Sequence, residues 1–216
     1  MAIISEKDAA DLQAFFKEVL KDPVKMVFFK SISCQLCDDE EQLLKEVAEL
    51  SDLVELEIKD LDADQDEAKS YKVENAPGLV FLNKDGDFTG VMYTGAPFGY
   101  EFTSVIESIK MISTGDTGLD EKVREEVKAV DQETHIKVFV TPSCPYCPRA
   151  VIIAHQFALE NPNIIGEMIE AQEFMEMSQL YAVSAVPKII INERIEFEGA
   201  LPAKHFLEYL KEAVGV

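Results

Sequence analysis

Four cysteines in this chain of 216 residues form two Cys-x-x-Cys pairs, Cys34 with Cys37 and Cys144 with Cys147. Thiols at this spacing can bind a metal ion, close a loop as a disulfide, or exchange electrons with another thiol pair. A chain with so few cysteines is not built as a disulfide scaffold, so a catalytic or metal-binding role is expected. Because both pairs have the same spacing, one chemistry should explain both.

The two pairs belong to an internal repeat. The second pair lies 110 residues after the first, and the same offset relates Tyr71 to Tyr181, Val73 to Val183 and Pro77 to Pro187. This shared register predicts two copies of one unit, residues 1–115 and 116–216, joined in the glycine-containing stretch Ser113–Gly118.

Each copy places its cysteines between a predicted strand and a predicted helix. A short apolar run precedes each pair, and apolar residues at helical spacing follow it. The predicted order in each copy is helix, strand, helix, strand, helix, strand, strand, helix, with Asp85-Gly86 at the last turn of the first copy. This alternation predicts an α/β protein in which each copy has a central mixed sheet flanked by helices.

A strand–helix junction favours electron exchange by the cysteines. Cys34 and Cys144 are expected at helix N-termini, where free N–H groups and the helix dipole stabilise a thiolate. Cys37 and Cys147 can then attack the mixed disulfide and release the partner. A shared zinc site is disfavoured because Cys144 comes 107 positions after Cys37, whereas zinc-binding pairs are usually roughly 15–20 residues apart. We expect no metal site; an inert pair of core cysteines is the other alternative.

Pro77 and Pro187 each follow the second cysteine of their copy by 40 residues and precede an apolar run. A proline at a strand start is ordinary, because it has no N–H to give to the sheet. Its recurrence in register with the cysteines favours a functional role, and we predict cis peptide bonds at Ala76-Pro77 and Val186-Pro187. Together these four residues are the predicted substrate-binding loops.

The charges around the two pairs differ. Four acids, among them Asp38 and Asp39, follow Cys37, whereas Pro148 and Arg149 follow Cys147. Acids should raise the pKa of the Cys34 thiol and Arg149 should lower that of Cys144. The second pair is therefore expected to be the stronger attacking site.

The formal net charge of −21 disfavours nucleic acid and anionic membranes as partners. Charged residues interrupt the N-terminal stretch before a signal-peptide core could form, and no apolar run is long enough to span a membrane. We therefore expect the protein in the cytoplasm.

The sequence "CPYC" at Cys144–Cys147 resembles the glutaredoxin active site, and "AVP" at Ala185–Pro187 resembles the cis-proline loop of the thioredoxin superfamily. The duplicated chain resembles the two-unit protein disulfide oxidoreductases, also called glutaredoxin-like proteins. The resemblance implies two tandem thioredoxin-like folds and redox-active disulfides Cys34–Cys37 and Cys144–Cys147, with no further cofactor. It also implies exchange with disulfide-containing proteins, electrons from a thioredoxin-reductase-like flavoprotein, and a peroxiredoxin as a further partner.

The chain departs from this pattern in two ways. No acid stands in the strand before either cysteine pair, so Glu57 and Glu167 are the candidates for a proton acceptor, with water as the alternative. The dipeptide Gln35-Leu36 matches neither the glutaredoxin nor the thioredoxin motif. Other functions remain open: a relay module feeding a peroxiredoxin, a redox-inert chaperone or binding module, and a glutathione-dependent or iron–sulfur glutaredoxin.

Overall fold

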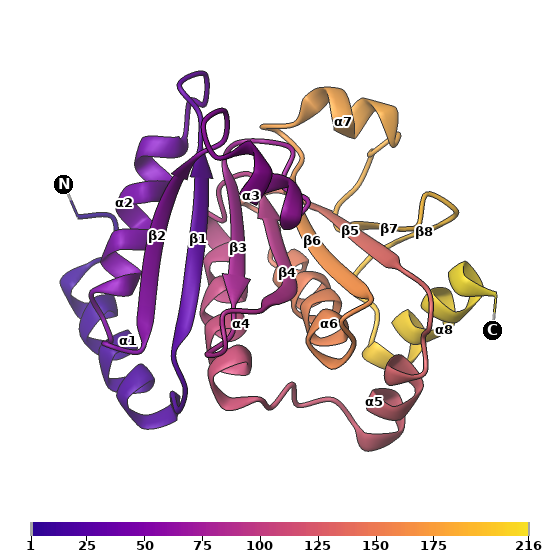
Figure 1. Ribbon diagram of the computed structural model, residues 1–216. Coiled ribbons are helices and arrows are strands. Elements are labelled where there is room, and N and C mark those ends of the chain that lie inside the picture. Colours follow the sequence, from indigo (N-terminus) through magenta and orange to yellow (C-terminus); the bar gives the residue numbers. More distant parts are fainter. Residues whose placement is uncertain (1, 216) are drawn as a thin grey trace. The chain divides into compact units, whose positions relative to one another are not determined.

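The computed structural model describes residues 2–215 (Figure 1). They form two compact units that are interleaved in sequence. One unit contains the residues up to Thr89 together with Ile109–Asp116, and the other contains Gly90–Ser108 together with the residues from Thr117 onward. The division into domains 1–115 and 116–216 remains a proposal, since the compact units allot Gly90–Ser108 to the second half of the chain.

The order of elements predicted for each copy is confirmed in both copies, with one short 3-10 helix added. The first copy contains α1 (Glu6–Val19), β1 (Val24–Lys30), α2 (Cys37–Ala48), β2 (Val54–Asp60), α3 (Gln65–Ser70), β3 (Gly78–Leu82), β4 (Phe88–Thr94), η1 (Gly99–Glu101) and α4 (Phe102–Thr114). The second contains α5 (Glu121–Lys128), β5 (Thr134–Val140), α6 (Cys147–Glu160), β6 (Ile164–Glu170), α7 (Met175–Leu180), β7 (Lys188–Ile191), β8 (Ile195–Glu198) and α8 (Ala203–Val214).

The strands of the first unit form a mixed sheet around β1. Strand β1 is parallel to β2, with Val24 opposite Val54, and antiparallel to β3, with Met26 opposite Phe81. Four consecutive β1 residues, Met26–Phe29, are fully buried, as expected for an apolar central strand covered on both faces. The predicted turn at Asp85-Gly86 is confirmed, with Gly86 at a φ of 84° that suits glycine.

The second unit repeats this arrangement around β5 and adds β4. Strand β6 is parallel to both β4 and β5, with Gly166 opposite Val91 and Ile136. Strand β7 is antiparallel to β5 and β8. In each unit the central strand, which precedes the cysteine pair, therefore lies between one parallel and one antiparallel neighbour, as the predicted mixed sheets require.

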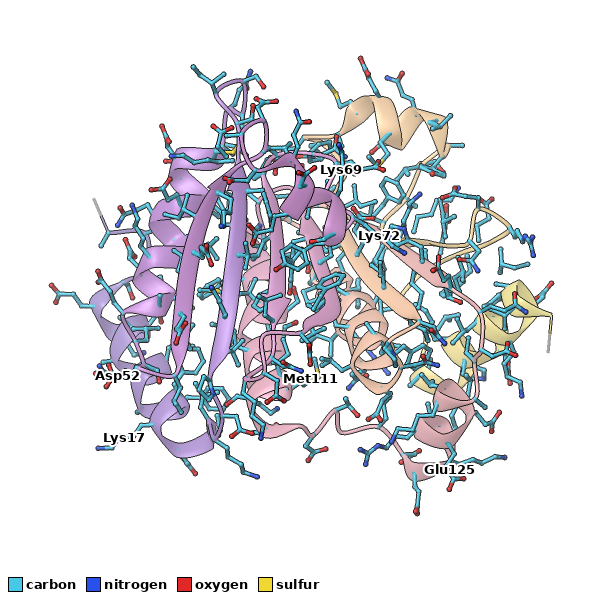
Figure 2. The ribbon with its side chains drawn as sticks, in the orientation of Figure 1. Lys17, Asp52, Lys69, Lys72, Met111 and Glu125 are labelled. Carbon is cyan, nitrogen blue, oxygen red and sulfur yellow. A yellow bond between two sulfur atoms is a disulfide. The ribbon has the colours of Figure 1, made fainter. Side chains whose placement is uncertain are left out.

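Most charged side chains lie at the outer surface, as their hydration requires. Lys17 on α1 and Glu125 on α5 are exposed and point away from the ribbon in Figure 2, whereas Met111 is buried. None of the helices formed by residues 2–215 has the length and apolarity needed to cross a bilayer.

Candidate redox-active sites

Each cysteine pair is joined as a disulfide between a central strand and the helix that follows. The bonds are Cys34–Cys37 and Cys144–Cys147, each with a Cα–Cα distance of 5.5 Å. Among residues 2–215, no group of three or more metal-ligating side chains is assembled. The sulfurs are therefore paired within each unit, which is inconsistent with zinc ligands shared between the pairs.

The helices begin at the second cysteine of each pair, not at the first. Cys37 and Cys147 are the first residues of α2 and α6. Cys34 and Cys144 lie just before the helices, in turns closed by N–H bonds of 3.1 Å to the carbonyls of Ser31 and Thr141. Cys34 and Cys144, which were expected at the helix N-termini, thus lie three residues before the first helical residue of α2 and α6.

The helix N-terminus nevertheless acts on the first sulfur of the second pair. The backbone N–H of Cys147 donates to Sγ of Cys144 at 3.1 Å. A donor at the positive end of a helix stabilises a thiolate at this sulfur.

Burial separates the roles of the two sulfurs in each pair. Cys37 and Cys147 are 2% and 0% exposed. Cys144 is 7% exposed and Cys34 is half-buried. In each pair the first cysteine is thus more exposed than the second, which favours the first as the residue that meets an incoming disulfide.

The predicted cis bonds at Ala76-Pro77 and Val186-Pro187 are confirmed. In the second unit the loop lies against the disulfide, because the Val186 carbonyl oxygen is 3.8 Å from Sγ of Cys144. Pro77 and Pro187 are buried, whereas Ala76 and Val186 are half-buried. We name Cys34, Cys37 and Ala76-Pro77 the first site, and Cys144, Cys147 and Val186-Pro187 the second site.

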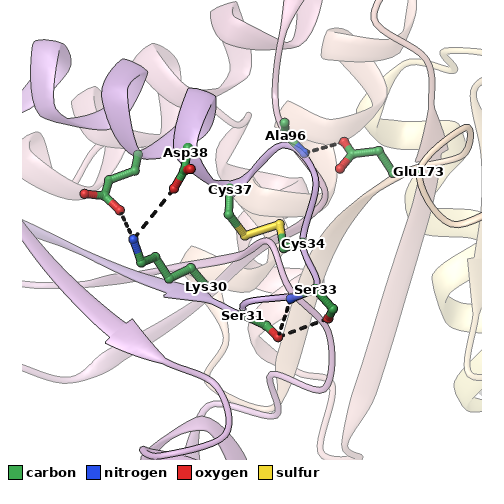
Figure 3. Close-up of a disulfide and its surroundings, with 9 residues drawn as sticks. Lys30, Ser31, Ser33, Cys34, Cys37, Asp38, Ala96 and Glu173 are labelled. Atoms are coloured by element: carbon green, nitrogen blue, oxygen red, sulfur yellow. Dashed lines mark hydrogen bonds and ion pairs between the residues drawn. A yellow bond between two sulfur atoms is a disulfide. The ribbon is translucent and has the colours of Figure 1, made fainter.

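The acids that begin α2 have a cation among them, which the sequence analysis did not consider. Figure 3 shows the Lys30 ammonium beside the first disulfide, 2.6 Å from a Glu41 oxygen and 3.9 Å from an Asp38 oxygen. Lys45 bonds the other Glu41 oxygen, and these two lysines lower the pKa of Glu41. Asp38 and Asp39 are exposed, so solvent screens their charge. The first site is therefore less negative than its sequence alone indicates.

A groove of about 740 Å³ lies within the second unit. Its lining includes Pro145, Pro148 and Arg149, which flank the cysteines in sequence, and Lys204 of α8. Arg149 is exposed and has no ion-pair partner within the described range 2–215. This places the predicted modulating cation next to the cysteine motif but in solvent.

The two carboxylates considered as proton acceptors are already engaged elsewhere. Glu57 pairs with Lys25 and Lys59. Glu167 accepts a 2.6 Å hydrogen bond from Thr94 and lies 2.7 Å from Nε2 of His135. Neither is shown in contact with a cysteine.

A third carboxyl group, Glu101, was missed by the sequence analysis. It is 1% exposed, it ends η1, and η1 contacts α6. Its neighbour Tyr100 donates an N–H bond of 3.0 Å to the carbonyl of Pro142, two residues before Cys144. Glu101 accepts from the Ser104 hydroxyl at 3.0 Å, and burial raises its pKa to about 7. It is thus a carboxyl group able to hold or release a proton near neutral pH, in a short helix that contacts α6, the helix that begins with Cys147.

The buried polar network continues along the same helices. The Tyr93 hydroxyl donates to Ser104 at 3.1 Å, and Ser108 lies 3.0 Å from Nδ1 of His155. His155 is fully buried, as its place in an apolar helix predicts, and burial lowers its pKa to about 3. The imidazole is therefore neutral and structural.

Known proteins share this arrangement. A family model described as a thioredoxin domain matches residues 134–212. A solved structure of a protein disulfide oxidoreductase from Aeropyrum pernix is 34% identical, covers 98% of this chain and 94% of its own, and superposes with a TM-score of 0.91. The chain belongs to the protein disulfide oxidoreductases.

This family membership explains the two tandem thioredoxin-like folds, each with a Cys-x-x-Cys disulfide. The alkyl hydroperoxide reductase component AhpF of Enterococcus faecalis, at 24% identity, has the same fold, with 95% of this chain and 98% of that chain covered and a TM-score of 0.89. The corresponding alkyl hydroperoxide reductase component of Staphylococcus aureus is 27% identical over 169 residues, which are 78% of this chain and 30% of that protein. The aligned part of the chain spans between 25% and 31% of the length of the first three curated relatives.

Proposed function

We propose that this protein reduces disulfides of other proteins, with the second site as the attacking site and the first as a weaker partner. The observation that carries the proposal is the second site itself. There, Sγ of Cys144, a residue that is 7% exposed, accepts a helix N-terminal N–H bond and lies 3.8 Å from the carbonyl oxygen that precedes a cis-proline. Such a sulfur is both activated and placed next to a loop that can hold an incoming chain.

In the proposed reaction, the Cys144 thiolate attacks one sulfur of the substrate disulfide. A mixed disulfide forms, and the other substrate sulfur leaves as a thiolate that takes up a proton. Cys147 loses its proton and attacks Sγ of Cys144, which releases the second substrate sulfur and closes the Cys144–Cys147 disulfide. Two electrons have passed to the substrate, and two are needed to reopen the disulfide.

Glu101 is the proposed proton acceptor for Cys147. Its raised pKa, about 7, suits it to take up a thiol proton near neutral pH, and its helix η1 contacts α6, which begins with Cys147. The donor of the two electrons is proposed to be a thioredoxin-reductase-like flavoprotein, and the exchange uses the two disulfides without a bound cofactor. We place this reaction in the cytoplasm.

A second function, a relay that passes electrons to a peroxiredoxin, is favoured by the curated relatives that are named as components of alkyl hydroperoxide reductase. Both proposals share the chemistry of the second site and differ in the acceptor. A redox-inert chaperone is the less favoured alternative, because both sites keep bonded cysteine pairs.

Single-site variants test the proposal. We expect Cys144→Ser to lose most of the dithiol-driven reduction of insulin, and the matched variant Cys34→Ser to keep most of it. Equal losses would contradict the ranking of the sites, and no activity in the unmodified protein would favour the chaperone. Replacing insulin by an oxidised peroxiredoxin, with a flavoprotein reductase as donor, separates the two acceptors.

A further inference from the structure

The residue after the cis-proline of the second site is a buried lysine. Lys188, the first residue of β7, is 5% exposed. A buried ammonium group is costly unless hydrogen bonds and opposite charges replace its water. The hydrogen bonds and ion pairs of the Lys188 ammonium should therefore show which part of the fold it stabilises.

The ammonium binds the start of the loop that ends in the cis-proline. Nζ of Lys188 donates to the carbonyl oxygen of Tyr181 at 2.8 Å and lies 3.4 Å from that of Ala182. Tyr181 is the C-cap of α7, where unpaired carbonyls carry partial negative charge. A carboxylate oxygen of Glu196 completes the set at 3.0 Å. Lys188 thus joins the beginning of the loop to the residue that follows its end.

The beginning of this loop is also held by partial packing. No residue of α7 is fully buried, but Met177, Tyr181 and Val183 pack against the buried cluster of Phe139, Ile169 and Ile190. The Tyr181 hydroxyl accepts a hydrogen bond of 2.7 Å from Lys137, and its ring packs 5.5 Å from that of Phe139. Tyr181 is therefore bonded by two lysines, one at its side chain and one at its backbone.

The first unit closes the corresponding loop in another way. The position equivalent to Lys188 is Gly78, where a Cβ would lie 2.7 Å from both the Asn75 oxygen and the Val73 side chain. Its Tyr71 packs against the rings of Phe29 and Phe88. The first unit therefore holds this loop by tight packing around Gly78 and Tyr71, whereas the second unit holds it by the buried charge of Lys188.

We infer that Lys188 is a positioning residue of the second site. Its ammonium holds the loop Tyr181–Pro187 closed, which keeps the Val186 carbonyl against Sγ of Cys144 and presents the loop to the substrate chain. Lys188 itself touches neither sulfur. The inference deepens the proposed function and rests on it for its kinetic consequences.

The test uses Lys188→Met in a full-length background with Cys34→Ser and Cys37→Ser, so that only the second site reacts. Loss of hydrogen bonds to a charged group should speed amide hydrogen exchange in residues 181–187 by about tenfold and lower kcat/KM for insulin about tenfold, mainly through KM. The reduction potential of the Cys144–Cys147 pair and the amide exchange of residues 71–77 should not change. Glu196→Gln, which removes only the outward partner of Lys188, is the matched control and should resemble the parent.

Unchanged amide exchange in residues 181–187 would overturn the inference. Faster exchange throughout the second unit would also overturn it, because that result indicates general destabilisation. The amide measurement needs no activity, so it judges Lys188 even if the parent fails to reduce insulin. That failure would count against the proposed function alone.

Discussion

Among single residues, those around Sγ of Cys144 distinguish the second site from the first. Sγ of Cys144 accepts the Cys147 N–H, while the cation Arg149 stands in solvent two residues further on. A fixed donor at 3.1 Å outweighs an exposed charge, because water and salt screen the latter. Activation of Cys144 should therefore depend more on the helix start than on Arg149.

Arg149→Gln should accordingly have only a small effect. We expect the rate of Cys144 alkylation by iodoacetamide at neutral pH to fall about twofold, as for the loss of one exposed charge. Lys204→Gln, in the lining of the same groove, is the control and should leave the rate unchanged. A tenfold fall in Arg149→Gln would show that the arginine contacts the thiolate directly.

Glu101→Gln should change how stability depends on pH. The folded-state pKa is about 7, against an ordinary value of 4.5. The stabilisation by the neutral buried carboxyl is therefore complete below the lower value and is lost as pH rises through the higher one. Glutamine stays neutral at every pH. The free energy of unfolding of the variant, relative to that of the parent, should therefore rise by on the order of 3 kcal/mol between pH 4 and pH 8.

Thermal unfolding of Glu101→Gln and parent across this pH range measures that gain. Comparing the two proteins at each pH cancels the titration of the other carboxylates. A constant difference would mean that Glu101 titrates like an exposed group. If Glu101 also accepts the Cys147 proton, the variant should lose the rise of second-site activity around pH 7.

At the scale of elements, α6 lies close to β6 because β6 contains a glycine. A Cβ on Gly166 would lie 2.6 Å from the backbone carbon and oxygen of Ala154. Side chains elsewhere on β6 are buried, so the helix that begins with Cys147 has no space to retreat without opening the core.

Gly166→Ala should thus destabilise the second unit, by about 1–3 kcal/mol as for other overpacked cores. The measurement is chemical denaturation followed by far-UV circular dichroism. Gly199→Ala is a suitable control: its φ of 91° imposes backbone strain, but nothing lies within 4 Å of the added Cβ. Gly199→Ala thus measures backbone strain alone, which Gly166 does not have; an unchanged stability in Gly166→Ala would argue against close packing of α6 on β6.

At the scale of the whole molecule, the repeat in sequence and the compact units in space do not coincide. Val91–Thr94 of β4 pair with β6, and Glu101 and Ser108 bond within the second unit. A fragment containing residues 116–216 has the entire second copy but lacks these partners.

We expect the fragment 116–216 to be unstable and the fragment 90–216 to fold better, although it exposes other surfaces. Loss of β4 leaves one edge of β6 unpaired, which favours aggregation. Limited proteolysis and size-exclusion chromatography of the two fragments check this expectation. Equal stability would support the domain division at residues 115 and 116 predicted from the repeat.

The sequence alone determined the features that depend on local spacing. Apolar periodicity gave the order of helices and strands, and the offset of 110 residues gave the duplication and the two cysteine pairs. The same register led to the cis bonds at Pro77 and Pro187. Each of these features can be found by comparing a short segment of one copy with the corresponding segment of the other.

The tertiary structure decided what depends on residues that are distant in sequence. Glu101 is one of 41 acids, and only its burial beside η1 and α6 raises its pKa. Lys30 partly neutralises the acids near the first site by its ion pair with Glu41. Lys188 holds the loop of the second site by its hydrogen bond to the Tyr181 carbonyl. Neither contact belongs to a sequence motif. Proton affinity and loop position are set by the surrounding dielectric and by bonds across the fold, which exist only once the chain has folded.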